Sequence, residues 1–115
     1  MGRDHLIPES PVKSMWTLAL FDLPVVSTED RRNYSHFRKA LLAEGFLRLQ
    51  FSVYARYCDS REKTQTTLRR VRVELPPQGE VRFLAVTDKQ FAEMTVYHGK
   101  KTKKAEDQPQ QMMLF

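Results

Sequence analysis

The chain has 115 residues, a formal net charge of +5 and a single cysteine, Cys58. This length suits one compact domain with its own core, and one cysteine excludes an internal disulfide framework and a cysteine-based zinc cluster. No apolar run reaches the roughly 18 residues that span a bilayer, and the N-terminus lacks the apolar centre of a signal peptide. We expect a cytoplasmic protein with no membrane contact, and its basic balance favours a nucleic-acid partner.

Residues 1–14 are predicted to form an irregular arm, because Pro8 and Pro11 interrupt any helix there. A folded domain is expected over residues 15–98. Its first strand, residues 15–22, is apolar on both faces and ends on a carboxylate, Asp22. A strand of this kind is usually covered on both faces.

A helix is predicted over residues 28–44, with Ser27 or Thr28 as its cap and Gly45 at its end. Its apolar stripe consists of Tyr34, Phe37, Leu41 and Leu42, and its other face carries Arg31, Arg32, Arg38 and Lys39.

Residues 46–57 alternate as a long strand, which we expect to bend near Phe51 into two strands. One parity, from Leu47 to Tyr57, is predicted to face the core. The other parity carries Phe46, Arg48, Gln50, Ser52, Tyr54 and Arg56 and is predicted to form a polar face.

A second helix is predicted over residues 60–74, followed by a strand over 80–87 and a weaker strand over 93–98 at a sheet edge. Residues 99–115 form a basic linker that ends in four apolar residues: Met112, Met113, Leu114 and Phe115. This end is either a frayed terminus or a strand that docks on a partner.

The order of elements predicts an α+β, ferredoxin-like sandwich with two helices on one face of an antiparallel sheet. The opposite face also holds apolar residues, which we expect to be Trp16, Leu18, Leu20, Phe46 and Tyr54. An exposed apolar sheet face indicates a partner, and we therefore predict a homodimer that packs through this face.

Asp22 has two interpretations. Aspartate is common where a strand turns. Alternatively, a two-fold dimer brings the same residue of each chain near the axis, and two Asp22 carboxylates could share Mg²⁺ and activate water for phosphodiester hydrolysis.

The sequence around these residues resembles a known family. The segments LALFDLPV, EDRRNYSHFRKALLAEGFLRLQFSVYAR, LPPQGEVRFLAVTDKQF and QQMMLF are similar to the small universal adaptation subunit of CRISPR systems, in a variant like that of type II systems. This subunit is often called the CRISPR-associated endoribonuclease. The resemblance covers about residues 14–115.

The resemblance implies a ferredoxin-like homodimer with Mg²⁺-dependent RNase or DNase activity, in which Asp22 is the catalytic and metal-binding residue. It associates Arg31, Arg32, Arg48 and Tyr54 with nucleic-acid binding, and it assigns Met112 to Phe115 to assembly. It also implies a scaffold for spacer acquisition that holds double-stranded prespacer DNA, with RNA as a further ligand, and bridges the CRISPR adaptation integrase. The alternative is a ferredoxin-like nucleic-acid-binding or regulatory module without catalysis.

Overall fold

The computed structural model describes residues 14–109. The predicted arm, apart from Ser14, and the predicted docking residues Met112 to Phe115 lie outside this range. The elements in chain order are β1 (Met15–Asp22), α1 (Thr28–Ala43), β2 (Leu47–Gln50), β3 (Val53–Cys58), α2 (Arg61–Val73), β4 (Glu80–Thr87), α3 (Asp88–Ala92), β5 (Val96–His98) and β6 (Lys101–Lys103).

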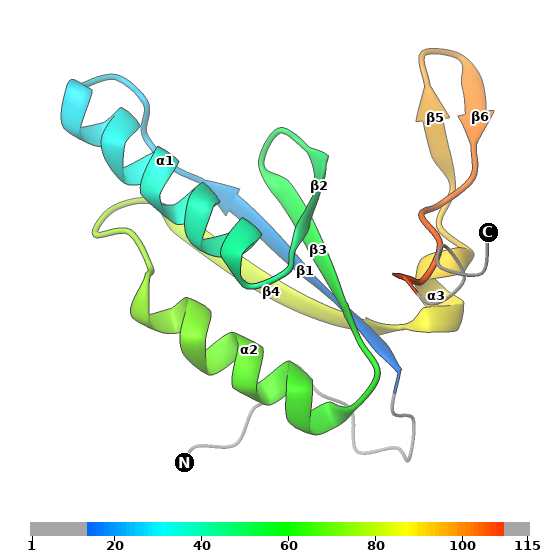
Figure 1. Ribbon diagram of the computed structural model, residues 1–115. Helices are drawn as coiled ribbons and strands as arrows, with labels where there is room; N and C mark the ends of the chain where they lie inside the picture. Colours follow the sequence, from blue (N-terminus) through cyan, green and yellow to red (C-terminus); the bar gives the residue numbers. More distant parts are fainter. Residues whose placement is uncertain (1–13, 110–115) are drawn as a thin grey trace.

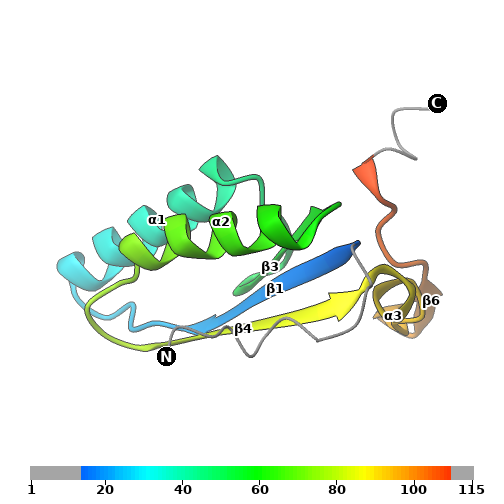
Figure 2. The ribbon, with the colours of Figure 1, turned by 90° about the horizontal axis from the view of Figure 1, so that it is seen from below.

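The first four strands form one antiparallel sheet in the order β2-β3-β1-β4. Figure 2 shows α1 and α2 side by side on one face of this sheet, and no such layer on the other. The predicted α+β, ferredoxin-like fold is therefore confirmed, as is the division of the long strand near Phe51.

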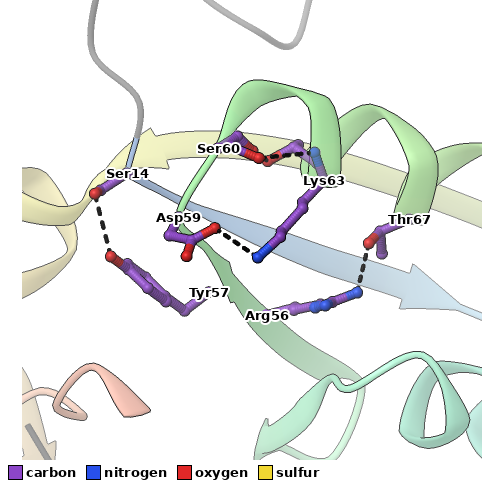
Figure 3. Close-up of polar contacts among 8 residues, drawn as sticks. Ser14, Arg56, Tyr57, Asp59, Ser60, Lys63 and Thr67 are labelled. Carbon is purple, nitrogen blue, oxygen red and sulfur yellow. Dashed lines mark hydrogen bonds and ion pairs between the residues drawn. The ribbon is translucent and has the colours of Figure 1, made fainter. Parts of the chain in front are cut away.

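Local sequence signals fix both long helices. Ser27 caps α1 with its side chain and forms a capping box with Asp30, and Gly45 follows the helix with a φ of 89°. Ser60 caps α2 by accepting a hydrogen bond from the backbone N–H of Lys63. Figure 3 shows this start of α2, where Lys63 also pairs with Asp59 at 3.0 Å.

The main core lies between the sheet and the two helices. Its buried members are Ala19, Phe21, Leu23, Phe37, Leu41, Phe46, Tyr54 and Val71. The ring of Phe21 meets Phe37 edge-on at a centroid distance of 5.2 Å, and lies 5.7 Å from the ring of Tyr54. β1 therefore contributes the centre of this core through its odd-numbered residues.

The predicted orientation of the long strand is wrong. Phe46 and Tyr54 face the helices, whereas Leu47 and Ala55 belong to a cluster with Trp16 on the other face. The alternation of residues was correct, but both parities are rich in apolar side chains, so alternation could not decide which of them the helices cover. Arg56 also lies on the helix-covered face, where its guanidinium donates to the hydroxyl of Thr67 on α2, as Figure 3 shows.

A second apolar cluster covers one end of the helix-free face. Its buried members are Trp16, Ala55, Phe91 and Ala105, and the rings of Trp16 and Phe91 stack at 4.0 Å. Phe91 comes from α3, a short helix that was not predicted from the sequence, and Ala105 comes from the segment that was predicted to be a linker.

The weaker strand is not at an edge of the main sheet. β5 pairs with β6 in a separate two-stranded sheet, so the predicted domain boundary at residue 98 falls inside this hairpin. Figure 1 shows the pair beyond α3 and apart from the four-stranded sheet. Over residues 14–109 no helix is both long and apolar enough to cross a membrane.

Candidate functional site

Asp22 is the last residue of β1, and its side chain is exposed. In the pairing of β1 with β4 it lies opposite Glu80, the first residue of β4. Directly opposed residues of antiparallel strands point to the same face, so two exposed acidic residues share one face at this end of the sheet. By its alternation with Phe21, Asp22 lies on the face that the long helices leave open.

Glu80 was not among the residues predicted for this site. The antiparallel plan pairs the end of the first strand with the start of the last, and this was the signal that could have identified it. The guanidinium of Arg82 lies 3.3 Å from the carboxylate of Glu80 and belongs to the same face. Arg82 therefore offsets part of the repulsion between the two carboxylates.

The backbone next to Asp22 depends on Gly79. Its φ is 91°, in the region that favours glycine. A Cβ atom at this position would lie 2.7 Å from the carbonyl oxygen of Asp22 and 2.8 Å from Cδ2 of Leu23. Glycine thus lets the loop before β4 pass directly against the end of β1.

The turn between β2 and β3 supports β1 from the other side. The backbone N–H of Phe21 donates to the carbonyl of Ser52 at 3.1 Å. The hydroxyl of Tyr34 on α1 donates to the carbonyl of Phe51 at 3.0 Å and lies 3.1 Å from the hydroxyl of Ser52. Tyr34, predicted only as a core residue, therefore also positions the turn beside Asp22.

The two arginines at the start of α1 have different environments. Arg31 donates to the carbonyl oxygens of Val26 at 2.7 Å and Val25 at 3.4 Å, so its guanidinium closes the loop between β1 and α1. Arg32 is exposed, and its side chain forms no hydrogen bond or ion pair within residues 14–109. Arg32 is therefore the better placed of the two to bind an external anion.

Arg48 and Tyr54 lie opposite each other in the pairing of β2 with β3. Arg48 is exposed, and its guanidinium carbon lies 5.8 Å from the ring centroid of Phe51. Tyr54 is only 1% exposed and belongs to the main core. The prediction that Tyr54 contacts nucleic acid is wrong for this structure, because its ring is buried between the sheet and the helices.

The acidic residues at the end of β1 could bind magnesium only if water or substrate supplied most of its ligands. No group of three or more histidine, cysteine, aspartate or glutamate side chains placed to hold a metal occurs in the described part of the chain. Mg²⁺ is commonly held by one or two carboxylates, while water and substrate phosphate complete its coordination. Asp22, with Glu80 opposite, supplies hard oxygen ligands of that kind, and a second chain would supply more.

Comparison with known proteins places this arrangement in a family. The family model described as CRISPR associated protein Cas2 matches residues 15–94, which include β1 to β4 and Asp22. The chain belongs to the Cas2 family. The region that matches the family model ends before β5, so the β5–β6 hairpin lies outside that match.

Curated Cas2 relatives match over nearly the full chain. A CRISPR-associated endoribonuclease Cas2 of Parvibaculum lavamentivorans is 46% identical over 101 residues, which cover 88% of this chain and 100% of the relative. A protein of the same name from Flavobacterium psychrophilum is 39% identical over 115 residues, the full length of both. One from Paracidovorax avenae is 41% identical, over 88% of this chain and 94% of the relative.

Proposed function

We propose that this chain is a Mg²⁺-dependent endoribonuclease that acts as a two-fold dimer, with Asp22 as its catalytic and metal-binding residue. The observation that carries the proposal is the position of Asp22, exposed at the end of a buried strand and on the helix-free face of the sheet. The name that the relatives carry, CRISPR-associated endoribonuclease, supports the type of reaction.

The dimer is proposed from the chemistry of that face. Leu84 is 49% exposed and lies opposite Leu18, and neither belongs to the core beneath the long helices. An exposed apolar sheet surface favours association, and an isologous contact places the same patch of both chains face to face. Asp22 of each chain would then border one shared interface.

The residues of this chain have distinct roles in the proposed reaction. Bound Mg²⁺ would supply a Lewis acid for the phosphodiester and lower the pKa of a coordinated water. Asp22 would hold that ion, and Glu80 would add negative charge from β4. Arg82 and Arg32, both exposed, offer guanidinium groups to the phosphates of the substrate.

The test compares Asp22→Asn with Asp107→Asn, which removes the same charge from an exposed residue behind β6. Asp22→Asn is expected to abolish Mg²⁺-dependent cleavage of a labelled RNA, while the dimer and its unfolding midpoint are retained. Asp107→Asn is expected to cleave at the wild-type rate. Cleavage by Asp22→Asn at the rate of the Asp107→Asn protein would refute the proposal.

A second role, as a scaffold of spacer acquisition, is favoured by the exposed arginines. Arg32 and Arg48 form no ion pair among the residues that the structure describes, and the chain carries a net charge of +5. We propose that they hold the backbone of double-stranded prespacer DNA while the dimer bridges the CRISPR adaptation integrase. Their interaction with phosphate would be strongly salt-dependent.

This role is tested by reversing both charges, Arg32→Glu with Arg48→Glu, in an integration assay with the integrase and a prespacer duplex. Integration is expected to fall at least tenfold while co-purification with the integrase persists. Normal integration would contradict the DNA-holding role. Failure of the unmodified chain to co-purify with an integrase would instead favour a regulatory module without a scaffold function.

A further inference from the structure

The β5–β6 hairpin forms a small ribbon outside the main sheet. Three residue pairs join its strands: Val96 with Lys103, Tyr97 with Thr102, and His98 with Lys101. Gly99 makes the turn with a φ of 65°. In Figure 1 the ribbon rises from the α3 end of the molecule and stands clear of the four-stranded sheet.

The ribbon concentrates positive charge at its turn and second strand. Lys100, Lys101, Lys103 and Lys104 are four cations within five positions, and all are exposed. Lys103 lies 4.0 Å from Glu106. Within residues 14–109 the other three lysines have no carboxylate at ion-pair distance.

Repulsion among these lysines destabilises the ribbon. Two strands of three residues are marginal in water, and cations on neighbouring positions repel one another. Lys101 and Lys103 project from one face of β6, roughly 6.6 Å apart along the strand. The ribbon therefore holds a local excess of positive charge that a bound polyanion would neutralise.

Both ends of the ribbon are nevertheless fixed to the domain. Before β5, Met94 packs against the cluster of Trp16 and Phe91, and after β6, Ala105 is buried in the same cluster. Asp88 completes the attachment by accepting hydrogen bonds from the indole of Trp16 at 3.0 Å and from the amide of Gln108. The ribbon thus projects from a buried base and not from a free linker.

We propose that the β5–β6 ribbon is a second nucleic-acid contact of this protein, an arm that binds the phosphodiester backbone through Lys100, Lys101, Lys103 and Lys104. The proposal deepens the proposed function, since it rests on the chain acting on nucleic acid. It assigns a contact outside residues 15–94, the region that matches the family model.

The composition of the ribbon favours nucleic acid over an acidic protein. Lysine is depleted at the centre of protein interfaces, which depend on aromatic and apolar anchors. The face with Lys101 and Lys103 offers no phenol, phenyl or indole ring, because Tyr97 lies on the opposite face with Thr102. Lysines without such anchors suit phosphate, and a two-stranded ribbon is narrow enough for the major groove of B-form DNA.

The test uses the full chain with all four lysines changed to glutamine, which lowers the formal net charge from +5 to +1. The matched control changes Lys39, Lys63, Arg69 and Arg72 to glutamine, four exposed cations on α1 and α2, and reaches the same net charge. Binding is measured by fluorescence anisotropy in EDTA between about 50 and 300 mM KCl, on a DNA duplex, an RNA duplex and a single strand of equal length.

Each lysine that neutralises a DNA phosphate contributes about 0.9 to the magnitude of the slope of log affinity against log salt. For the ribbon variant, the magnitude of this slope should therefore fall by up to about 3.6. For the control variant, the magnitude of the slope should fall by less than about one. A loss of two or more in the ribbon variant, together with a small loss in the control, supports the arm, and the nucleic acid with the largest loss identifies the preferred ligand. A loss below two, or an equal loss in the control, overturns it.

A second measurement distinguishes nucleic acid from acidic protein as the ligand of the ribbon. Direct anisotropy with labelled poly-glutamate makes this distinction: ribbon-dependent binding of poly-glutamate, together with DNA binding that is equal in the wild-type protein and the ribbon variant, would assign the ribbon to acidic protein and refute the nucleic-acid arm. If the ribbon variant binds normally while Asp22→Asn alone loses cleavage, the arm fails and the proposed nuclease stands. If the ribbon variant loses binding while Asp22→Asn still cleaves, the arm stands and the assignment of Asp22 fails.

Discussion

Substituting Gly79 tests whether the loop against Asp22 is as tightly packed as the structure has it. A non-glycine residue at positive φ costs about 1–2 kcal/mol. The new methyl group would lie 2.7 Å from the Asp22 carbonyl oxygen, which is backbone and cannot rotate away. Relief of such overpacking costs a further 1–3 kcal/mol or so, offset by about 0.4–1 kcal/mol from a stiffer unfolded chain. Gly79→Ala should therefore destabilise the protein by about 3 kcal/mol, or about 1.5 M in urea midpoint for a slope near 2 kcal/mol/M.

Gly99→Ala is the matched control. Gly99 also has a positive φ, of 65°, but a Cβ atom there meets nothing within 4 Å. Only the conformational cost remains, about 1 kcal/mol, and much of it falls on local opening of the ribbon rather than on global unfolding. Urea denaturation at equal protein concentration measures both variants. Equal losses, or a loss below about 1 kcal/mol for Gly79→Ala, would refute the close approach to Asp22.

Three further predictions follow from particular contacts. Arg31→Gln should lower the free energy of unfolding, measured by urea denaturation, by about 1 kcal/mol, because the loop hydrogen bonds of Arg31 are lost. Arg32→Gln should change the free energy of unfolding by less than about 0.5 kcal/mol. A larger loss for Arg32→Gln than for Arg31→Gln would contradict the role of Arg31 in closing the loop. Leu84→Glu should convert a dimer to monomer in light scattering, and an unchanged mass would exclude the sheet-face interface. Asp88→Ala should cost about 1–3 kcal/mol by leaving the buried indole N–H of Trp16 unpaired, and should shift the emission of this sole tryptophan; unchanged emission and stability would argue against that bond.

The candidate site was only partly predictable. Asp22 could be identified because a carboxylate directly after an apolar strand stands out in sequence. Glu80 could not, because its role depends on which residue of another strand lies opposite. Tyr54 was predicted on the wrong face of the sheet. It shares its parity with Arg48 and Arg56, and a strand position of this kind can belong to a polar face or to the core. The different roles of Arg31 and Arg32 could not be predicted either. Two adjacent arginines look alike in the sequence, and only the folded loop places the carbonyl oxygens of Val25 and Val26 beside Arg31.

Local signals by themselves determined the two long helices, α1 and α2, the four strands of the main sheet, β1 to β4, and the order of these elements along the chain. Capping residues, periodicity and glycines act within a few positions along the chain, so Ser27, Ser60 and Gly45 mark their elements without knowledge of the fold. Tertiary structure alone decided which face of the long strand the helices cover, the attachment of α3 and Ala105 to Trp16, and the separate β5–β6 ribbon. The first two of these features depend on packing between segments distant in sequence, and a pattern that is apolar on both faces fits either side until that packing is complete. The ribbon is a local hairpin, but the polar, lysine-rich sequence of β6 carries no alternating apolar pattern that would mark a strand.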